Sequence, residues 1–445
     1  MNSTRKVIIF PSNRPNSQSA YSAKDGAPQI NFQIGNQPAW LDAQSLTLNF
    51  TLEILDVAGN PPNNDDQRGT GVAGDVRTNA LMGGMACIDS IDITNANNNS
   101  LEFVRALPRL AATLIPYRSN FDDYANDIQY SFGATSNTEA QGMFDNSPRQ
   151  ISAPLLAGMF LGQDLIPLGD RGVGGLNITL NIAASIEALF GLQGAGAYYK
   201  ITNPTLRATM VHPPQGQLPP IENYSYLAYS NYYSTISNSD VTQNINCNLS
   251  SVLSTFTNFV PTSWIASSLN DGNATYELLD PSVGIASQVP ISRFTLLRSA
   301  IQYPYRFQLT EANNITQTGA GAAGGYQVVY EAQLQRNAYT GVAVGMKNLS
   351  NTLVGNTSQG TQAISTVVAP LDQHFNSIGL KAFAIGGRYD GLSIGEGASF
   401  IGRPFSQRIE SKYTPLTGLP NSSFTFMLSK HMLSFDDRGS SSLAN

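Results

Sequence analysis

The chain has 445 residues, of which only 13% are charged, and its formal net charge is -6. This length can bury two sizeable cores and predicts about two or three domains. An acidic chain without clustered lysine and arginine is not suited to wrapping nucleic acid, so direct sequence-specific nucleic-acid binding is excluded. Asn, Ser, Thr, Gln and Gly replace the missing charges, and such a surface favours burial against copies of the same chain.

The cysteines and the apolar runs indicate whether the chain has disulfides, a signal peptide or a transmembrane segment. Cys87 and Cys247 lie in different halves, within strand-like apolar runs, and are predicted to be buried free thiols and not a disulfide framework. The apolar run at residues 7–10 is too short for the core of a signal peptide. No apolar run reaches the ~18 residues of a membrane span. We therefore expect neither a signal peptide nor a transmembrane segment.

The first part of the chain predicts an arm followed by strands. Residues 1–40 contain four prolines and little periodicity, which indicates an extended arm. Apolar and polar side chains alternate at residues 42–56, and this period of two predicts a strand with one buried face. A helix is predicted at residues 101–114, with Ser100 as its N-cap. Further strands are predicted at residues 85–94, 176–182 and 205–211, and a buried apolar run at residues 151–160.

A proline-rich stretch divides the chain near its midpoint. Residues 212–220 hold four prolines and one glycine, so neither a helix nor a central strand can cross them, and we expect a semi-rigid linker. The order of elements then recurs, with similar positions such as Leu206 and Phe426 lying 220 residues apart. A repeat of this length indicates a duplicated domain. The second set comprises strands at residues 242–261, 294–309 and 422–435, a helix at 326–339 and an apolar run at 375–385.

Both halves combine many short strands with long Gly- and Asn-rich loops and few helices, which predicts an all-β protein made of β-sandwiches or jelly rolls. We expect an N-terminal arm at residues 1–40 and a first jelly roll at 41–211. The linker at 212–220 and a second jelly roll at 221–445 complete the division.

Three patterns suggest chemistry, and none forms a catalytic or metal constellation. The G-x-S-x-G match around Ser393 lacks a following helix, since two further glycines and a proline come next. The G-x-G-x-x-G match at residues 319–324 lacks both a preceding strand and a ribose-binding acid. His212, His374 and His431 are dispersed, and the near pair of Asp372 and His374 indicates a loop hydrogen bond. We expect no enzyme activity, no cofactor, no metal, and no catalytic or cofactor-binding residues.

Five tyrosines gather just after the proline-rich stretch. They could form a sugar-binding or partner-binding surface, but packing between domains or subunits is the preferred interpretation, because tyrosine supplies apolar area and a polar tip. The cluster comprises Tyr224, Tyr226, Tyr229, Tyr232 and Tyr233.

Three stretches together resemble the double jelly-roll major capsid proteins of the tectivirus, adenovirus and polinton-like virus lineage. They are the strand from Cys87 with its Asn-rich turn, the run from Ala153 to the Ile166-Pro167-Leu168 turn with the strand behind it, and the run from Phe375 to Ser393 with the closing strand from Phe424. The run before the Pro-Leu turn departs from the large-virus pattern, since Gly158-Met159-Phe160 stands where an aromatic run is usual.

The resemblance implies two tandem jelly rolls with short helices in the loops, and a structural major capsid protein whose pseudo-hexagonal trimers tile an icosahedral shell. Implied partners are the homotrimer, neighbouring capsomers, minor capsid or penton proteins, and an internal membrane reached by the N-terminal arm. Arg5 and Lys6 of that arm could meet such a membrane or the genome. The implied location is the virion. A tandem β-sandwich that binds glycans or a receptor is the alternative from a different class.

Overall fold

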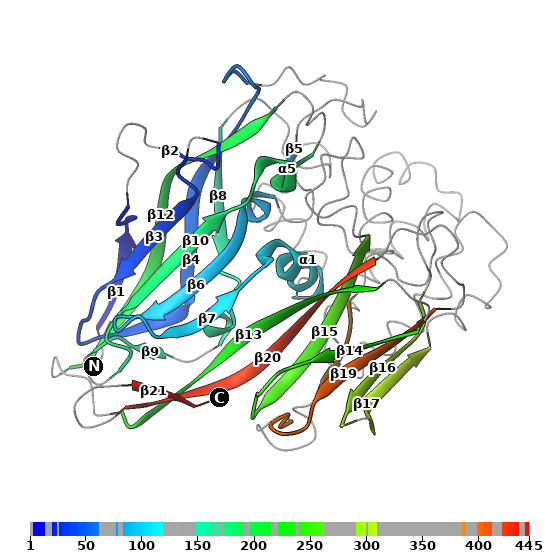
Figure 1. The fold of residues 1–445 in the computed structure, drawn as a ribbon. Helices are drawn as coiled ribbons and strands as arrows, with labels where there is room; N and C mark the ends of the chain where they lie inside the picture. The colour runs from blue at the N-terminus through cyan, green and yellow to red at the C-terminus, as the bar shows by residue number, and fades with distance from the viewer. Residues whose placement is uncertain are drawn as a thin grey trace, which may run out of the picture.

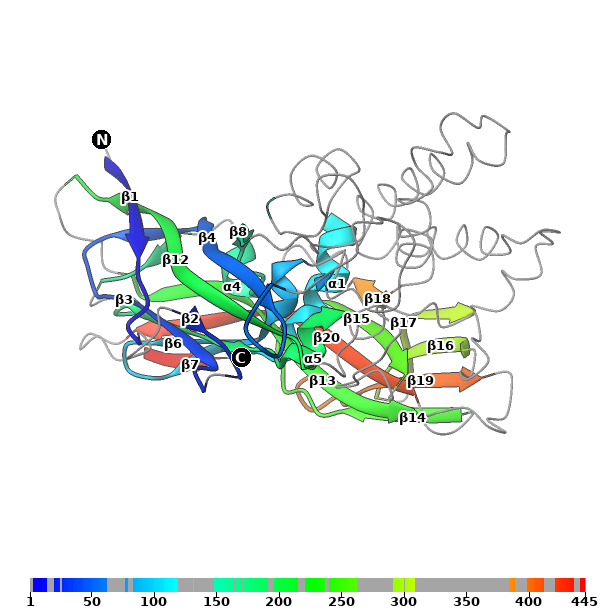
Figure 2. The same cartoon turned by 90° about the horizontal axis from the view of Figure 1, so that it is seen from above.

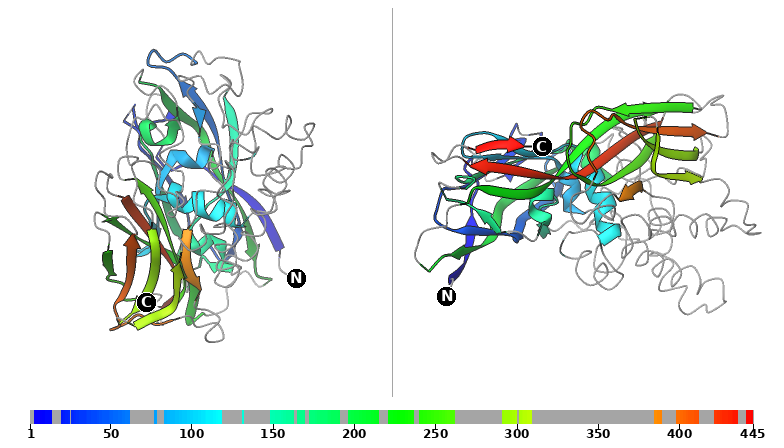
Figure 3. Two further views of the ribbon diagram at one scale, coloured as in Figure 1. Left: turned by 90° about the vertical axis from the view of Figure 1, so that its right-hand side faces the viewer. Right: turned by 90° about the horizontal axis from the view of Figure 1, so that it is seen from below.

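Within the part of the chain that the computed structural model describes, strands form two β-sandwiches that lie side by side (Figures 1 and 2). The described residues are 3–13, 20–24, 26–61, 77–78, 83–118, 131, 148–162, 165–169, 172–190, 196–214, 221–236, 240–261, 291–299, 301–308, 384–388, 398–411, 421–435 and 441–444. The two further views in Figure 3 show the same pair of layered units.

The first sandwich consists of two antiparallel sheets, drawn in blue to green. One sheet has the order β1 (Ser3–Ile9), β12 (Tyr198–His212), β4 (Trp40–Leu55) and β8 (Arg149–Pro154), with the short strands β2 (Ala20–Tyr21) and β9 (Leu165–Pro167) attached. The facing sheet has the order β3 (Gln29–Ile34), β10 (Leu176–Ile182), β6 (Ile88–Asn95) and β7 (Ser100–Val104). A separate pair is formed by β5 (Arg77–Thr78) and β11 (Leu189–Phe190).

The second sandwich has the same construction. Its first sheet has the order β13 (Asn223–Ile236), β20 (Asn421–Phe435), β15 (Val252–Pro261) and β18 (Ala384–Arg388), and β21 (Ser441–Ala444) pairs with β20. Its second sheet has the order β14 (Asp240–Ile245), β19 (Phe405–Ser411), β16 (Ile291–Arg298) and β17 (Ile301–Gln308).

The two sandwiches share one topology, strand for strand. The order β1-β12-β4-β8 corresponds to β13-β20-β15-β18, and β3-β10-β6-β7 corresponds to β14-β19-β16-β17. If the two- and three-residue strands β2, β5, β9 and β11 are left out, the strands that correspond follow each other in the same order along the two halves of the sequence. The 220-residue offset between Leu206 and Phe426 connects the corresponding strands β12 and β20. The predicted duplication is therefore visible in the order of the strands, although residue identities hardly repeat.

Alternating side chains explain why these segments form half-buried strands. In β4, Leu46, Leu48, Phe50 and Leu52 are almost fully buried, while Thr47 and Thr51 between them are partly exposed. Across the facing sheet, Leu180 of β10 lies opposite Ile30 of β3 and Ile91 of β6, and all three are fully buried. Such rows fill the space between the two sheets with apolar area, at roughly 25 cal/mol per Å² removed from water.

The helix predicted at residues 101–114 is wrong in its first part. Residues 101–104 belong to β7, and helix α1 (Leu107–Arg118) begins only afterwards. The reason is the turn before β7, in which the side-chain oxygen of Asn95 accepts the N–H groups of Asn97 and Asn99 and Asn98 takes a left-handed φ of 60°. This turn folds β7 back on β6 as a hairpin.

The described part of residues 1–40 is not a separate arm. β1 pairs with β12 from Ser3 to Ile9, and β3 pairs with β10. Val7 and Ile9 pack against the core, and Pro11 and Pro28 fall outside both strands, where proline breaks no strand interior. These strands hold the ranks that β13 and β14 hold in the second sandwich.

The other predicted elements agree with the structure or lie outside the described residues. The strands expected at residues 42–56, 176–182, 205–211 and 422–435 are found, and residues 242–261 and 294–309 each hold two strands or parts of them. The segment at 85–94 begins as the short helix η1 (Gly84–Cys87), and the run at 151–160 ends in α4 (Gly158–Leu161). The helix expected at 326–339, most of the run at 375–385, and residues 215–220 of the linker lie outside the described residues.

Candidate functional site: the junction between the two sandwiches

The two sandwiches meet where two edge strands face each other. β7 is the last strand of its sheet and β13 is the first strand of its own, so both carry backbone groups that no neighbouring strand of the same sheet can pair. α4 also lies against β13, and Arg109 of α1 lies over the ring of Phe424 in β20. Side chains from both halves provide the hydrogen bonds here.

Glu102 of β7 is the central group of this junction. Its side chain is buried, with the residue only 3% exposed, and its carboxylate accepts three backbone N–H groups. Oε1 accepts the N–H of Gly158 at 2.7 Å, and Oε2 accepts that of Met159 at 2.9 Å, at the beginning of α4 in the same sandwich. Oε1 also accepts the N–H of Tyr229 at 2.7 Å, which belongs to the edge strand of the other sandwich. One carboxylate therefore connects three separate segments.

Burial raises the pKa of Glu102 from 4.5 to about 7, and the N–H groups of Tyr229, Met159 and Gly158 act in the opposite direction. The carboxyl group thus changes its charge near neutral pH. Burial also raises the pKa of Tyr226, and the negative charge of Glu102 adds to the rise.

Further polar contacts cross the junction on both sides of Glu102. The hydroxyl of Tyr226 in β13 donates to the carbonyl of Leu101 at 2.9 Å. In the other direction along β13, the side-chain oxygen of Asn231 accepts the N–H of Arg105 at 3.3 Å. The guanidinium of Arg109, on α1, lies 5.5 Å from the ring centre of Phe424 in β20. These contacts join the first sandwich to both β13 and β20.

Close backbone packing accompanies the hydrogen bonds. A Cβ placed on Gly158 would lie 2.8 Å from the Cα of Ala228 and 2.9 Å from the carbonyl oxygen of Leu227. Real Cβ atoms do not approach backbone atoms so closely, so a residue with a side chain would push α4 away from β13. The absence of a side chain at Gly158 is what allows the N–H of Gly158 and the N–H of Tyr229 to reach the same carboxylate oxygen.

Of the five tyrosines, Tyr226 packs between the two halves, since it is buried and its hydroxyl reaches the carbonyl of Leu101. Tyr229 is also buried, but only its backbone N–H crosses the junction, and its ring lies 6.3 Å from that of Phe256 in the second sandwich. Tyr226 also stacks on Tyr224 and on His431, at ring-centre distances of 6.1 and 5.6 Å. Tyr233, by contrast, is 52% exposed. The cluster therefore does not form one continuous exposed surface.

The other residues considered for chemistry do not come together in the described part of the chain. His431 is buried and its Nε2 hydrogen-bonds with the hydroxyl of Ser429 at 2.8 Å. Cys87 and Cys247 are both buried and free, as predicted. The described residues contain no group of three or more His, Cys, Asp or Glu side chains that could hold a metal ion. Ser393 with its flanking motif, residues 319–324, Asp372 and His374 lie outside the described residues.

Sequence reasoning missed Glu102 and Gly158. The available signal was a single acidic residue within an apolar run, Leu101-Glu102-Phe103-Val104, because a charge in a buried strand needs a partner. No local pattern pointed to Gly158, since its role depends on a strand 70 residues further along the chain.

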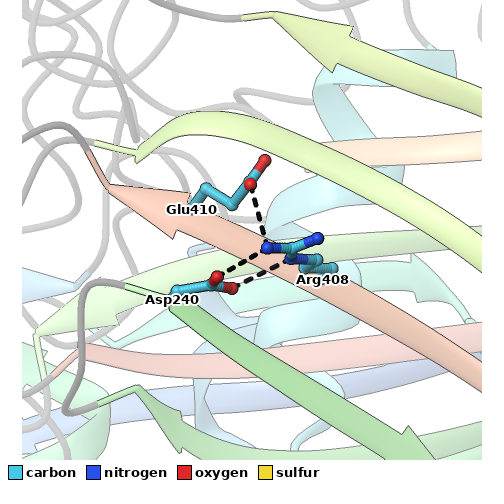
Figure 4. A network of polar contacts seen from close by, with 3 residues as sticks. All are labelled: Asp240, Arg408 and Glu410. Carbon is cyan, nitrogen blue, oxygen red and sulfur yellow. Dashed lines mark hydrogen bonds and ion pairs between the residues drawn. The ribbon is translucent and has the colours of Figure 1, made fainter.

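A cluster of ion pairs on the outer face of the second sandwich illustrates how the few charges are used (Figure 4). Asp240 and Glu410 are opposite each other in β14 and β19, and Arg408 bridges them, at 2.6 Å from Asp240 and 3.3 Å from Glu410. Hydrogen bonding from Arg408 lowers the pKa of Asp240. Since Arg408 and Asp240 are about half exposed, this cluster relieves the repulsion of two like charges but adds little stability.

Comparison with known proteins defines the fold. No family model and no curated protein matches the sequence. Among solved structures, the chain is similar to the Faustovirus major capsid protein, with a TM-score of 0.58, 12% identity, and coverage of 98% of this chain and 91% of the other. The structure of the Sputnik virophage gives a TM-score of 0.58 with 12% identity, covering 99% and 88% of the two chains. PBCV-1 VP54, fitted into a reconstruction of Sputnik, gives 0.56 with 11% identity, covering 100% and 97%.

The chain has a double jelly-roll fold. Among the described residues, the two sandwiches share eight corresponding strands in the same order, and the chain aligns with these structures over almost its whole length, which meets that description. Sequence identity of 11–12% shows the shared fold and nothing finer. In this double jelly roll, Glu102 and Gly158 set the contact between the two rolls.

Proposed function

We propose that this chain is a structural capsid protein, three copies of which form a pseudo-hexagonal tile of an icosahedral shell. The observation that carries the proposal is the repetition of one eight-strand topology within one chain. Three chains around a threefold axis then place six similar sandwiches in a ring, which is close to sixfold symmetry and can pave a flat facet. The likeness to structures described as capsid proteins supports this use of the fold.

The surface composition is consistent with extensive association between copies. Charged residues are only 13% of the chain, and some described residues expose large apolar side chains, including Ile8 and Phe10 at 57% each. We propose division into two jelly-roll units, with residues 212–220 as the connection between them. We further propose a virion location, with contacts to neighbouring capsomers and to minor capsid or penton proteins.

We also propose that the chain contacts an internal membrane through Arg5 and Lys6, which are exposed on β1. No helix among the described residues is long and apolar enough to cross a membrane. Binding to anionic vesicles that is lost in an Arg5→Ala, Lys6→Ala double variant would support it. Equal sedimentation of wild type and the double variant with these vesicles would contradict it.

The proposal is tested by the solution mass of the purified chain, measured by light scattering, with electron microscopy of the same peak. Three chains of 47.7 kDa give about 143 kDa, and six-sided outlines are expected. A monodisperse monomer would contradict the capsid proposal. Saturable glycan binding by that monomer would instead support the alternative role as a glycan- or receptor-binding module.

A further inference from the structure

The interior of the second sandwich contains a polar cluster where the first sandwich is apolar. Gln243 of β14 and Gln407 of β19 lie opposite each other on one sheet, and Thr257 of β15 and Thr425 of β20 lie opposite each other on the facing sheet. Ser423 of β20 lies beside them. All five are buried, with Gln243 the most exposed at 6%.

The corresponding place in the first sandwich shows that polarity is not a requirement of the fold. There, Phe32 of β3 lies opposite Ile178 of β10, which lies opposite Ile93 of β6, and all three are almost completely buried. The matching row of the second sandwich is Gln243, Gln407 and Leu296. A polar group taken from water costs free energy unless it is hydrogen-bonded, so the second core depends on how well these side chains satisfy each other.

Three of the side chains form a closed ring of hydrogen bonds. Gln407 Nε2 donates to Thr425 Oγ1 at 2.9 Å, and Thr257 Oγ1 donates to Gln407 Oε1 at 2.9 Å. The two threonine hydroxyls are 2.9 Å apart. Because Thr257 uses its proton on Gln407, Thr425 must donate to Thr257, which closes the ring.

Gln243 is attached to this ring by one end of its amide only. Its Oε1 accepts from Gln407 Nε2 at 2.5 Å and from Ser423 Oγ at 3.1 Å. Its Nε2 is buried and has no hydrogen-bond partner within the described part of the chain. An amide nitrogen left in this way destabilises the folded state, because it has lost its hydrogen bonds to water without gaining a new one.

Exchanging the oxygen and nitrogen of the amides still leaves one end of the Gln243 amide without a hydrogen-bond partner in the described part of the chain. If both amides are turned over, Gln243 Nε2 donates to Gln407 Oε1 and Ser423 Oγ, and the ring runs in the opposite direction with every hydroxyl still satisfied. Gln243 Oε1 then occupies the unpaired position. In both arrangements the same end of Gln243 points away from the ring without a partner in the described part of the chain, first as a donor and then as an acceptor.

We propose that the free end of the Gln243 amide binds a buried water molecule that completes the polar core of the second sandwich. Water is the ligand of choice because it can accept from Nε2 or donate to Oε1, and so suits both arrangements. A cation would be repelled by the amide N–H groups, and an anion would be repelled by the carbonyl oxygen. The ring connects β19 across the core with β15 and β20, through residue pairs that are 150 and 18 positions apart in the sequence. Gln243 and the water add β14 to this connection.

An experimental structure of the full chain at a resolution that shows ordered water tests the proposal. The expected result is a density peak at about 2.7–3.2 Å from the free amide atom of Gln243. Contact of that atom with carbon atoms only, or a hydrogen bond to a protein atom, would overturn the proposal.

Two variants separate this water from any other in the core. Gln243→Met keeps the side-chain volume and removes the amide, so the peak should disappear. Thr257→Val breaks the ring and leaves the free end of Gln243 unchanged, so the peak should remain. A peak that persists in Gln243→Met would show that other atoms hold the water and would overturn the assignment. If Gln243→Met does not fold, the density peak in the wild type and in the Thr257→Val variant still shows whether the water is bound at Gln243.

Discussion

The carboxylate of Glu102 accepts the backbone N–H of Tyr229 at 2.7 Å, across the boundary between the two jelly rolls. Tyr229 lies in an edge strand, so this N–H has no strand of its own sheet to pair with. The same oxygen accepts the N–H of Gly158, which fixes α4 against β13. A buried carboxyl group, and not apolar packing alone, therefore determines how the two rolls meet.

Replacing Glu102 with glutamine should destabilise the protein. The introduced amide can accept N–H groups only at its oxygen, so its NH₂ group faces a backbone donor, and one N–H at the junction is left unpaired. We expect a loss of about 2 kcal/mol in the free energy of unfolding near pH 7. Chemical denaturation measures it, and Glu222→Gln, on an exposed residue just before β13, serves as control. Equal stability of both variants would mean that Glu102 is not important for the junction.

Stability should also depend on pH through Glu102. Its pKa is about 7 in the folded protein and 4.5 when unperturbed, so between these values the folded protein holds a proton that the unfolded chain has lost. The contribution of Glu102 is therefore fully present below pH 4.5 and is lost as the pH rises towards 7. The slope is at most about 1.4 kcal/mol per pH unit.

Denaturation of wild type and Glu102→Gln at several pH values between 4.5 and 8 isolates this contribution, because other carboxyl groups titrate equally in both proteins. The stability of wild type should fall with rising pH relative to the variant, so the penalty of the substitution is greatest at acidic pH and levels off above pH 7. A difference that does not change with pH would contradict the raised pKa.

The junction should also be sensitive to a single methyl group at Gly158. In Gly158→Ala the new Cβ would lie 2.8 Å from the Cα of Ala228, so α4 and β13 must separate. We expect a loss of about 1–3 kcal/mol in unfolding free energy. Gly162→Ala is the matched control, since a Cβ there meets nothing within 4 Å and its φ is -72°. If both variants melt alike, the packing at Ala228 is looser than described.

Strands and their duplication could be predicted from the sequence, but the junction could not. Alternation in β4 and β10 is a local signal, because burial of one face repeats every second residue. Sequence reasoning misses β1 because the residues of Ser3–Ile9 are mostly exposed and show no clear alternation. It predicts a helix in place of β7 because the apolar residues from Leu101 to Leu114 have helical spacing. The turn formed by Asn95 overrides that spacing, and the segment divides into a strand and a helix.

The contacts of Glu102 and Gly158 depend on which distant strands the fold brings together. Tyr229 is 127 residues from Glu102, and no periodicity in the sequence encodes that distance. The polar core was also not predicted, since Gln243 and Gln407 each look like an ordinary polar residue within an alternating strand. Only their cross-strand pairing places them together, facing the interior.

The two cysteines should not react with thiol reagents while the protein is folded. Burial raises the pKa of the Cys247 thiol to about 11 and that of Cys87 still further, so the reactive thiolate is scarce at neutral pH and is also shielded from solvent. A chromogenic disulfide reagent at pH 8 should detect no thiols in the native protein and two per chain in denaturant. The single variants Cys87→Ser and Cys247→Ser assign any residual reactivity. Rapid reaction of Cys247 would contradict this prediction and would mean that the segment between β14 and β15 opens readily. The backbone N–H of Cys247 bonds within this segment, to the carbonyl of Ile245 at 3.0 Å, so such opening would not have to break the sheet.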